Sequence, residues 1–222
     1  MSIPVLIIGQ SGTGKSASLR NFKNSELELI NVEGKPLPFR NDFEPLNSDS
    51  YRDISIQIKK TKKKAVVIDD AGYLITNSFM RGHSAGGGGN SVFTLYNQLA
   101  DDFWKLIGFS KALEPDKIVY FMMHEDKKDD GTVKPKTVGK MLDEKVCLEG
   151  MFTIVLRSAY EDGKYVFHTN TDGFDVCKTP IGMFDTAEID NDLKVVDEKI
   201  RDYYNLNSRI QENKKATKGT TK

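Results

Sequence analysis

The residues best suited to chemistry lie near the start of the chain, where glycines, a lysine and a serine occur at fixed spacing. Residues 9–16 read GQSGTGKS and match the pattern G-x-x-x-x-G-K-[ST] at every fixed position. Glycines let such a loop wrap a polyphosphate with successive backbone N–H groups pointing inward, which a Cβ would obstruct. Lys15 would then reach the β- and γ-phosphates of ATP, and the Ser16 hydroxyl would coordinate Mg²⁺. The expected nucleotide contacts are Gly9, Gln10, Ser11, Gly12, Thr13, Gly14, Lys15 and Ser16.

A second acidic element is needed to hold the metal, and the sequence offers one after residues 65–68. This short apolar run (AVVI) is typical of a buried strand, and Asp69 and Asp70 follow it directly. An acid at the carboxyl end of a strand beside the phosphate loop can bind Mg²⁺ directly or through water. We expect Asp69 to be the metal ligand and Asp70 to be its polarising partner. A strand that ends in a solvated acidic turn is the alternative interpretation.

The spacing of the apolar runs predicts an α/β fold, a mostly parallel central sheet flanked by helices. Residues 3–8 (IPVLII) are apolar throughout, as expected for a parallel strand buried on both faces, and they run directly into the phosphate loop. A glycine-rich turn without a ligand is disfavoured by this preceding strand. Further strands are expected at residues 27–32, 117–123, 151–156 and 165–169, the last two paired across the turn 161–164.

Two of these strands end in polar, titratable residues. Glu33 follows the strand 27–32, and His124 follows the strand 117–123. Open parallel sheets bind ligands beyond the carboxyl ends of their strands. Glu33 and His124 are therefore candidates for the same site as the phosphate loop.

Three helices are expected. One begins near Gly14 and would add the positive end of its dipole to the phosphate site. Others are expected at residues 91–113 and 190–203. Trp104 and Phe109 are interpreted as packing residues and not as groups that stack on a base. The side chains expected to face the sheet from the long helix are Leu95, Leu99, Phe103, Leu106 and Ile107.

Composition excludes membrane and secreted proteins and favours a cytoplasmic one. No apolar stretch approaches the roughly 18 residues of a membrane-spanning helix, and residues 1–3 lack the charged region of a signal peptide. Cys147 and Cys177 have no partners at metal-ligand spacing, so neither a disulfide framework nor a zinc site is expected.

The length and charge of the chain bound its organisation. The 222 residues fit one ATPase domain over residues 1–205, followed by a polar, Lys-rich tail over residues 206–222 that we expect to be disordered. The 32 basic residues are balanced by 32 acidic residues. Binding of nucleic acid over the whole surface is therefore not expected, although local basic patches are compatible with it.

The phosphate loop, the acidic strand and the two polar strand ends together resemble the RecA-like branch of P-loop ATPases, over roughly residues 1–185. In that branch the strand after the phosphate-loop helix ends in the glutamate that activates water, a position that Glu33 occupies. A polar sensor residue caps the strand inserted between the phosphate-loop strand and the acidic strand, and His124 matches it. Asp70 competes with Glu33 for water activation. A solvated loop acid and a histidine that merely caps its strand are the alternatives for Glu33 and His124.

RecA-like assemblies also use cations in trans: a cation from one subunit reaches the γ-phosphate that is bound by the neighbouring subunit. Lys178 lies in the region of the chain where this group is expected, and Lys140 and Arg157 are weaker candidates. The resemblance therefore implies a catalytic role for Lys178 and a homo-oligomer. RecA carries a polymerisation segment ahead of its core, whereas the phosphate loop here begins at residue 9. We expect any ring or filament to use core surfaces or the last helix.

A narrower resemblance is to small ATPases from phage recombination modules, which act as single-strand annealing proteins. It is carried by residues 30–38 (INVEGKPLP), 136–144 (KTVGKMLDE) and 177–180 (CKTP). It implies single-stranded DNA, and phage recombination or replication proteins, as partners. If the protein is phage-encoded, its location would be the host cytoplasm.

Three segments are candidates for the contact with DNA. The glycine-rich run 82–91, with the adjacent Arg81, could order around a phosphodiester backbone, or it could be a plain hinge. The loop 126–136 has mixed charge and is interpreted as a solvated hairpin tip. The basic cluster 59–64 is interpreted as a solvated connection at the opposite edge of the sheet from the nucleotide.

Three functions fit these features. The first is a DNA-dependent ATPase that binds single strands and promotes annealing or strand exchange. The second is a nucleotide-gated binding module with very slow turnover. The third, a small-molecule kinase, is least favoured because Arg is sparse and the segment after His124 is rich in Lys, Asp and Gly, where a kinase needs an Arg-rich lid.

Overall fold

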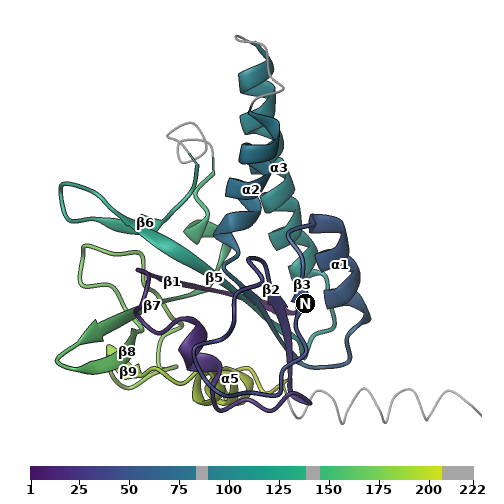
Figure 1. Cartoon of the computed structure of the whole chain (residues 1–222). Coiled ribbons are helices and arrows are strands. Elements are labelled where there is room, and N and C mark those ends of the chain that lie inside the picture. The colour runs from purple at the N-terminus through teal and green to yellow at the C-terminus, as the bar shows by residue number, and fades with distance from the viewer. Residues whose placement is uncertain (84–89, 139–145, 207–222) are drawn as a thin grey trace, which may run out of the picture.

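Nine strands in the part of the chain that the structure describes form one sheet with the phosphate-loop strand near its middle (Figure 1). The computed structural model describes residues 1–83, 90–138 and 146–206. The sheet order is β3-β2-β4-β5-β1-β7-β8-β9, and β6 pairs with β5. The strands are β1 (Ile3–Gly9), β2 (Leu27–Asn31), β3 (Leu46–Asn47), β4 (Ala65–Asp69), β5 (Ile118–Lys127), β6 (Val133–Pro135), β7 (Ile154–Glu161), β8 (Lys164–His168) and β9 (Glu188–Asp190).

The direction of the strands brings the predicted site residues to one edge. β3, β2, β4, β5, β1 and β7 run parallel, and β6, β8 and β9 run antiparallel to their neighbours. β5 lies between β1 and the acidic strand β4, which confirms the prediction of an inserted strand. In this register Gly9 lies opposite His124, and Asn31 lies opposite Asp69. The carboxyl ends of four parallel strands therefore meet at the phosphate loop.

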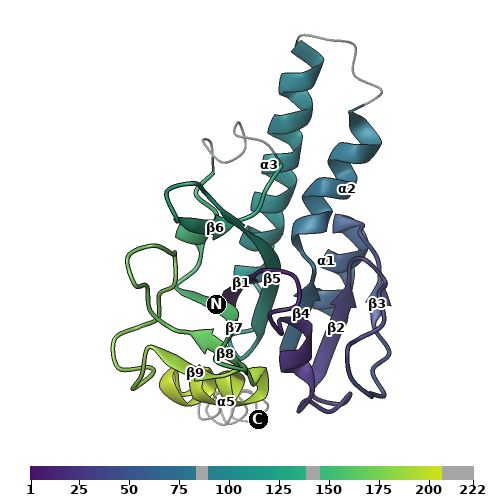
Figure 2. The same ribbon diagram turned by 60° about the vertical axis from the view of Figure 1, so that its left-hand side comes forward.

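Helices cover both faces of the sheet (Figures 1 and 2). On one face α1, α2 and α3 pack on alternate strand residues such as Leu6 and Ile8, and on the other face α5 and the turn η1 pack on Val5 and Ile7. This two-sided burial is the reason that β1 is apolar throughout. The helices are α1 (Tyr51–Lys60), α2 (Gly72–Gly82), α3 (Asn90–Lys111) and α5 (Leu193–Tyr203), with 3₁₀ turns at η1 (Ser16–Leu19) and η2 (Glu149–Met151).

The prediction of an α-helix after the phosphate loop is wrong. The chain forms only the 3₁₀ turn η1 there. The residues that follow, RNFKNSE, include Asn and Ser, which compete for backbone hydrogen bonds and disfavour a helix. The Glu26 carboxylate accepts from the backbone N–H of Lys23 and closes a turn instead. The contribution of a helix dipole is correspondingly small, and the backbone N–H groups of the loop must supply most of the attraction for a phosphate.

The long helix follows its prediction with one exception. Leu99, Phe103, Leu106 and Ile107 are buried against the sheet, and Leu95 and Phe109 are partly buried beside them. Trp104 is 52% exposed, so its interpretation as a packing residue is wrong. It lies about 100° around the helix from Phe103, off the apolar stripe.

Two other helices were not predicted. For α1 the sequence contains a helix signal, a capping residue followed by apolar residues at helical spacing. Ser50 accepts a capping hydrogen bond from the backbone N–H of Asp53, and Ile54 and Ile58 are buried four residues apart.

The run 82–91 was expected to be irregular, but its ends are helical, with Gly82 in α2 and residues 90–91 in α3. Residues 84–89 lie outside the described residues.

The remaining predictions hold with shifted bounds. β7 starts three residues later than expected, since η2 extends to Met151, and it pairs with β8 across the predicted turn. The expected last helix divides into β9 and α5. The loop 126–136 is a hairpin between β5 and β6, as predicted. Leu206, the first residue of the predicted tail, is buried in the core on the α5 side, and residues 207–222 lie outside the described part.

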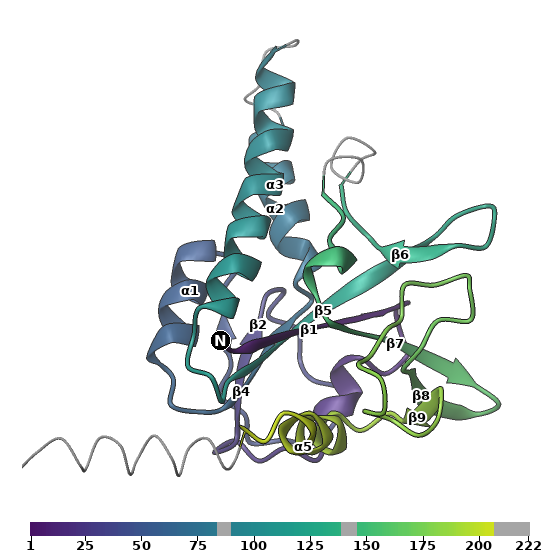
Figure 3. The ribbon, with the colours of Figure 1, turned by 180° about the vertical axis from the view of Figure 1, so that it is seen from behind.

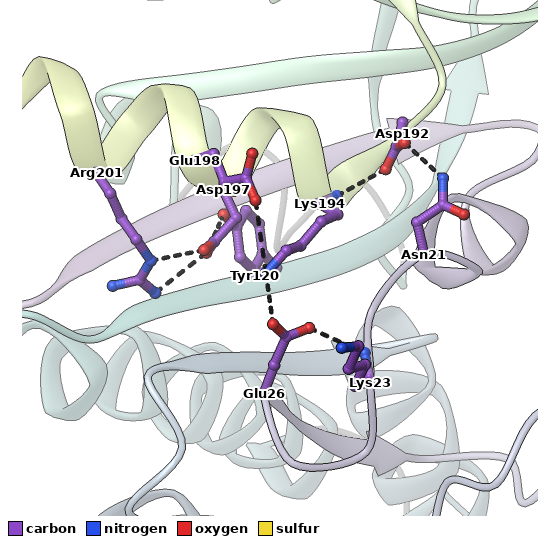
Figure 4. Close-up of polar contacts among 9 residues, drawn as sticks. All are labelled: Asn21, Lys23, Glu26, Tyr120, Asp192, Lys194, Asp197, Glu198 and Arg201. Carbon is purple, nitrogen blue, oxygen red and sulfur yellow. Dashed lines mark hydrogen bonds and ion pairs between the residues drawn. The ribbon is translucent and has the colours of Figure 1, made fainter.

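A group of polar contacts fixes α5 to the sheet and to the segment after the phosphate loop (Figure 4). The hydroxyl of the buried Tyr120 donates to Asp197 Oδ1 at 2.9 Å, and Arg201 makes two hydrogen bonds to the same carboxylate at 2.6 and 3.2 Å. Burial and the Asp197 charge raise the pKa of Tyr120 well above its ordinary value, so the phenol remains a donor. Lys194 binds Glu26 at 3.0 Å on the neighbouring segment.

Two hairpins project from the body, one formed by α2 and α3 and the other by β5 and β6 (Figures 1 and 3). Among the described residues, no helix has both the length and the hydropathy needed to cross a membrane.

Asp197→Ala removes the shared acceptor and leaves Tyr120 and Arg201 without their partner inside the fold. Because breaking a buried ion pair strands the remaining charge, we expect the free energy of unfolding to fall by about 3 kcal/mol or more. Urea denaturation measures this loss. Asp101→Ala, which removes the exposed partner of Lys105, is the control, and its urea midpoint should stay close to that of the wild type. Equal midpoints for the two variants would contradict the role given to Asp197.

Candidate nucleotide-binding site

The phosphate loop is held in a conformation that requires its glycines. Gly12 and Gly14 have φ angles of 82° and 96°, in the left-handed region that favours glycine. At Gly9 a Cβ atom would lie 2.6 Å from the carbonyl oxygen of Ser158, so this position must also lack a side chain. The loop therefore turns tightly off the end of β1, as the sequence pattern predicts.

Lys15 lies at the floor of the loop. It is only 6% exposed, and its Nζ donates to the carbonyl oxygens of Gly9 at 2.8 Å and Gln10 at 2.7 Å. Burial lowers the pKa of Lys15, and the negative charges of Asp70, Asp69 and Glu125 oppose this effect. A buried ammonium group that can exchange carbonyl partners for phosphate oxygens is suited to a polyphosphate.

A cavity of about 430 Å³ opens above the loop. Most of the predicted nucleotide and catalytic residues line it. Seven residues that were not predicted for the site do so as well: Ala17, Asn31, Lys35, Pro36, Leu37, Pro38 and Tyr165. Gly9, Gln10 and Thr13 belong to the loop but do not line the cavity. The Thr13 hydroxyl donates to the Gln10 carbonyl at 2.9 Å. The predicted residues that line the cavity are Ser11, Gly12, Gly14, Lys15, Ser16, Asp69, Asp70 and His124.

Ser16 and Asp69 are adjacent and fit a magnesium ion. The Asp69 carboxylate is 4% exposed, and the nearby Ser16 side chain acts to lower its pKa. Burial, together with the charge of Asp70, raises the pKa of Asp69 to about 6. A hard cation favours such oxygen ligands and would stabilise the ionised carboxylate in place of a proton. The donor set therefore suits Mg²⁺.

Asp70 lies between the Lys35 ammonium group and the His124 ring. Its Oδ2 is 2.5 Å from the Lys35 Nζ, and its Oδ1 is 3.5 Å from the His124 Nε2. Burial alone would raise the pKa of Asp70, but the hydrogen bonds from His124 and Lys35 outweigh it and lower the pKa to about 2. The residue also has a φ angle of 57°, a strained conformation outside glycine. Asp70 is thus a fixed, ionised acceptor that links β4 to β5.

Glu33 lies just beyond β2 and does not line the cavity. Its carboxylate accepts a hydrogen bond from the Asn77 side chain of α2 at 3.0 Å, and the same amide donates to Asp49. Glu33 is therefore oriented toward α2 at the margin of the site, and its role in activating water stays a prediction.

The three cations considered for action in trans differ in their surroundings. Lys178 pairs through its backbone with Val155 on the flank of β7 and does not line the cavity, so its role also stays a prediction. Arg157 makes a bidentate pair with the buried Glu125, at 2.8 and 3.0 Å, within its own chain. Lys140 lies outside the described residues.

The phosphate loop is also held from behind by a short chain of hydrogen bonds. The Ser158 hydroxyl on β7 donates to the Thr13 carbonyl at 2.5 Å, and the side-chain amide of Asn191 donates to Ser158 at 3.1 Å. Arg20, which follows η1, donates to the Asn191 carbonyl at 2.5 Å. Asn191 is 1% exposed and sits between β9 and α5. Thr13 in the loop and Arg20 after it are therefore both connected to Asn191, at the corner between β9 and α5.

Asn31 could have been found from the sequence, because it is the polar residue next to the end of the predicted strand 27–32, at the carboxyl edge. Its side chain donates to the Lys35 carbonyl at 2.7 Å and shapes the segment that brings Lys35 to Asp70. Lys35 follows a turn at Gly34, and Tyr165 approaches the loop from the β8 hairpin. Both depend on the path of the chain in three dimensions, so strand patterns do not reveal them.

Comparison with known proteins agrees with this geometry. A family model described as an AAA domain matches residues 1–179. The chain belongs to the AAA domain family. The AAA domain is a P-loop ATPase-type core, so nucleotide binding and an ATPase site follow for this chain, and the mostly parallel sheet fits the α/β fold of P-loop NTPases. The matched range of the AAA domain ends before β9 and α5. No curated protein matches the chain significantly.

Ser158→Ala leaves the Thr13 carbonyl without its donor and should loosen the phosphate loop. We expect the affinity for ATP to fall severalfold, because part of the binding free energy would then be used to order the loop. Equilibrium binding of ATP measures the change. Ser110→Ala is a matched control, because the Ser110 hydroxyl is equally buried and donates to the Ile107 carbonyl away from the site. Equal ATP affinities for the two variants would contradict the positioning role of Ser158.

Proposed function

We propose that this protein is a Mg²⁺-dependent ATPase that binds single-stranded DNA and promotes annealing or strand exchange in a phage recombination module. The AAA domain supplies the ATPase core. The recombination role is supported by the resemblance to small phage ATPases in residues 30–38 and 177–180. The RecA-like branch, a homo-oligomer and contacts with phage recombination or replication proteins are parts of the same proposal.

One observation carries the proposal: two elements connect the nucleotide end of the sheet with the two projecting hairpins. β5 includes His124 and continues to Lys127 at the hairpin. On the returning segment, the backbone N–H of Lys136 donates to the His124 carbonyl at 2.7 Å. α2 begins directly after Asp70 and Ala71. A change at the γ-phosphate can therefore reach both hairpins along continuous secondary structure.

The start of α2 is also in contact with the end of β5. The ring of Tyr73 meets the ring of His124 edge to face, with centroids 5.9 Å apart, and the backbone N–H of Ala71 donates to the Met122 carbonyl at 2.7 Å. In this proposal His124 forms a hydrogen bond to the γ-phosphate when ATP is bound. Loss of this bond after hydrolysis would change the contact of His124 with α2.

Hydrolysis in this site needs little covalent chemistry from the protein. Lys15 and the N–H groups of the loop offset the charge that develops on the γ-phosphoryl group, and a carboxylate orients water in line with the bond that breaks. Bound Mg²⁺, held by Ser16 and Asp69, would neutralise phosphate charge. Glu33 and Asp70 are the two candidates for orienting water. Lys178 would act on the nucleotide of a neighbouring subunit.

The hairpins offer cations to a phosphodiester backbone. Lys127, Lys128, Lys134 and Lys136 are exposed on or beside the β5–β6 hairpin. Arg81 is exposed near the end of α2, where it pairs with Asp49. By contrast, the cluster 59–64 lies at the amino end of β4, away from the nucleotide, and two of its lysines have local partners: Lys64 pairs with Asp116, and Lys63 donates to the Leu27 carbonyl.

A nucleotide-gated binding module with very slow turnover is the second candidate. The observation that favours it is the state of Asp70. Hydrogen bonds from His124 and Lys35 lower the pKa of Asp70 to about 2, which makes this carboxylate a poor proton acceptor. A small-molecule kinase is least supported, because the segment after His124 forms the β5–β6 hairpin, with lysines and no arginine.

ATP hydrolysis measured with and without a single-stranded oligonucleotide at low salt tests the proposal. We expect stimulation of severalfold that falls as salt is raised, because phosphate contacts release counterions. Lys15→Ala should abolish hydrolysis, and Lys105→Ala, an exposed lysine on α3, should not change it. Tight ATP binding with negligible turnover in both conditions would instead support the gated module, and phosphorylation of an added nucleoside would support the kinase.

Single-turnover hydrolysis by Glu33→Gln and Asp70→Asn distinguishes the two candidates for orienting water. We expect the Glu33 variant to lose at least tenfold in rate, because an amide cannot accept a proton from the attacking water. The Asp70 variant should lose less and should instead weaken the response to the oligonucleotide, since it breaks the contact with His124. Normal hydrolysis by Glu33→Gln would overturn the role of Glu33.

A further inference from the structure

A second cavity continues from the phosphate cavity. It has a volume of about 760 Å³ and shares three lining residues with the first, Ala17, Pro38 and Tyr165. Apolar side chains of Phe39 and Val195 contribute to its walls. The phosphate cavity, by comparison, is lined by Lys15, Asp69 and Asp70. Most of the wall area of the second cavity is thus apolar, although it is also lined by the charged residues Arg20, Lys164, Asp190, Asp192 and Lys199.

Tyr165 is an aromatic residue at the boundary between the two cavities. It projects from β8, remains 48% exposed and lies against the phosphate loop, where a Cβ on Gly14 would be 2.9 Å from its ring. Its ring centroid is 4.7 Å from that of Tyr160. The ring is therefore supported by the loop and by a neighbouring aromatic residue while much of its surface remains exposed.

We propose that Tyr165 is the platform on which the purine base of the bound nucleotide stacks, in a cavity that Pro38 and Phe39 also line. The inference rests on the proposed function, because it takes the triphosphate to be held by the phosphate loop. A nucleotide whose phosphates lie in the charged cavity must place its ribose and base in the space that adjoins it. An apolar cavity with an aromatic ring at its entrance is the chemistry that a base requires.

Stacking on one aromatic side chain changes affinity by about 5- to 150-fold per base, and it tolerates different bases because each has a π-face. The platform therefore contributes to the affinity for ATP and GTP alike and contributes nothing to inorganic tripolyphosphate, which has no base. This difference separates a base platform from a residue that supports the loop.

Equilibrium binding of ATP and of tripolyphosphate to the full chain, in the presence of Mg²⁺, tests the inference. Tyr165→Ala should lower the affinity for ATP at least fivefold and leave the affinity for tripolyphosphate unchanged. Tyr165→Phe, which keeps the ring, should bind ATP within twofold of the wild type. Trp104→Ala is the matched control, because Trp104 is similarly exposed on α3 and lines neither cavity.

Three results would overturn the inference, and they are distinguishable from one another. Unchanged ATP affinity in Tyr165→Ala, together with loss of binding in Lys15→Ala, would reject the platform and leave the proposed ATP site intact. Equal losses for ATP and tripolyphosphate would show that Tyr165 supports the loop and not the base. Failure of the wild type to bind either ligand would reject the proposed function, and the platform with it.

Discussion

The organisation of this protein depends on one electrostatic constraint, the burial of an ammonium group and several carboxylates at a single edge of the sheet. Lys15, Asp69 and Asp70 are each less than a tenth exposed, and they lie at or just beyond the ends of two parallel strands. Buried charges are costly unless they are paired or bind a ligand. The Lys15 ammonium is satisfied by loop carbonyls and Asp70 by Lys35 and His124, whereas burial raises the pKa of Asp69. A phosphate and a divalent cation would complete this charge balance.

The surrounding elements keep these groups in place. Ser158 and Asn191 hold the phosphate loop from β7 and from the β9–α5 corner, and α5 is in turn fixed by Tyr120 at the centre of the sheet. The matched AAA domain range ends at residue 179, so the Asn191 corner and α5 lie outside it. On the opposite side, Asp70 and His124 connect the site with α2 and β5, which continue to the projecting hairpins.

Residues 3–16 and 65–69 allowed the phosphate loop and its two neighbouring strand elements to be predicted, because these features are local. The strand at 117–123 was found from its apolar run, and its place between the other two was implied by the RecA-like resemblance. The roles of Ser16 and Asp69 as metal ligands stay predictions. The helix predicted after the loop does not form, because the prediction followed the phosphate-loop pattern and not the helix-disfavouring residues 20–26. The burial of Trp104 was predicted wrongly, since its apolar character was weighed without its position on the helix face. Lys35 and Tyr165 could not be found, because a turn at Gly34 and the twist of the β7–β8 hairpin bring them to the site. The roles of Glu33 and Lys178 depend on a bound nucleotide and a neighbouring subunit, and they stay predictions.

The sharing of one Mg²⁺ by Ser16 and Asp69 is tested most directly by a double-mutant cycle on ATP affinity. Ser16→Ala, Asp69→Ala and the double variant would be titrated with ATP in Mg²⁺ and again in EDTA, so that effects on the loop alone appear in both series. If both side chains hold the same ion, each single substitution removes most of the Mg²⁺-dependent gain in affinity, and the double variant loses little more. Losses that add in full, or a gain that survives in Asp69→Ala, would contradict a shared ion.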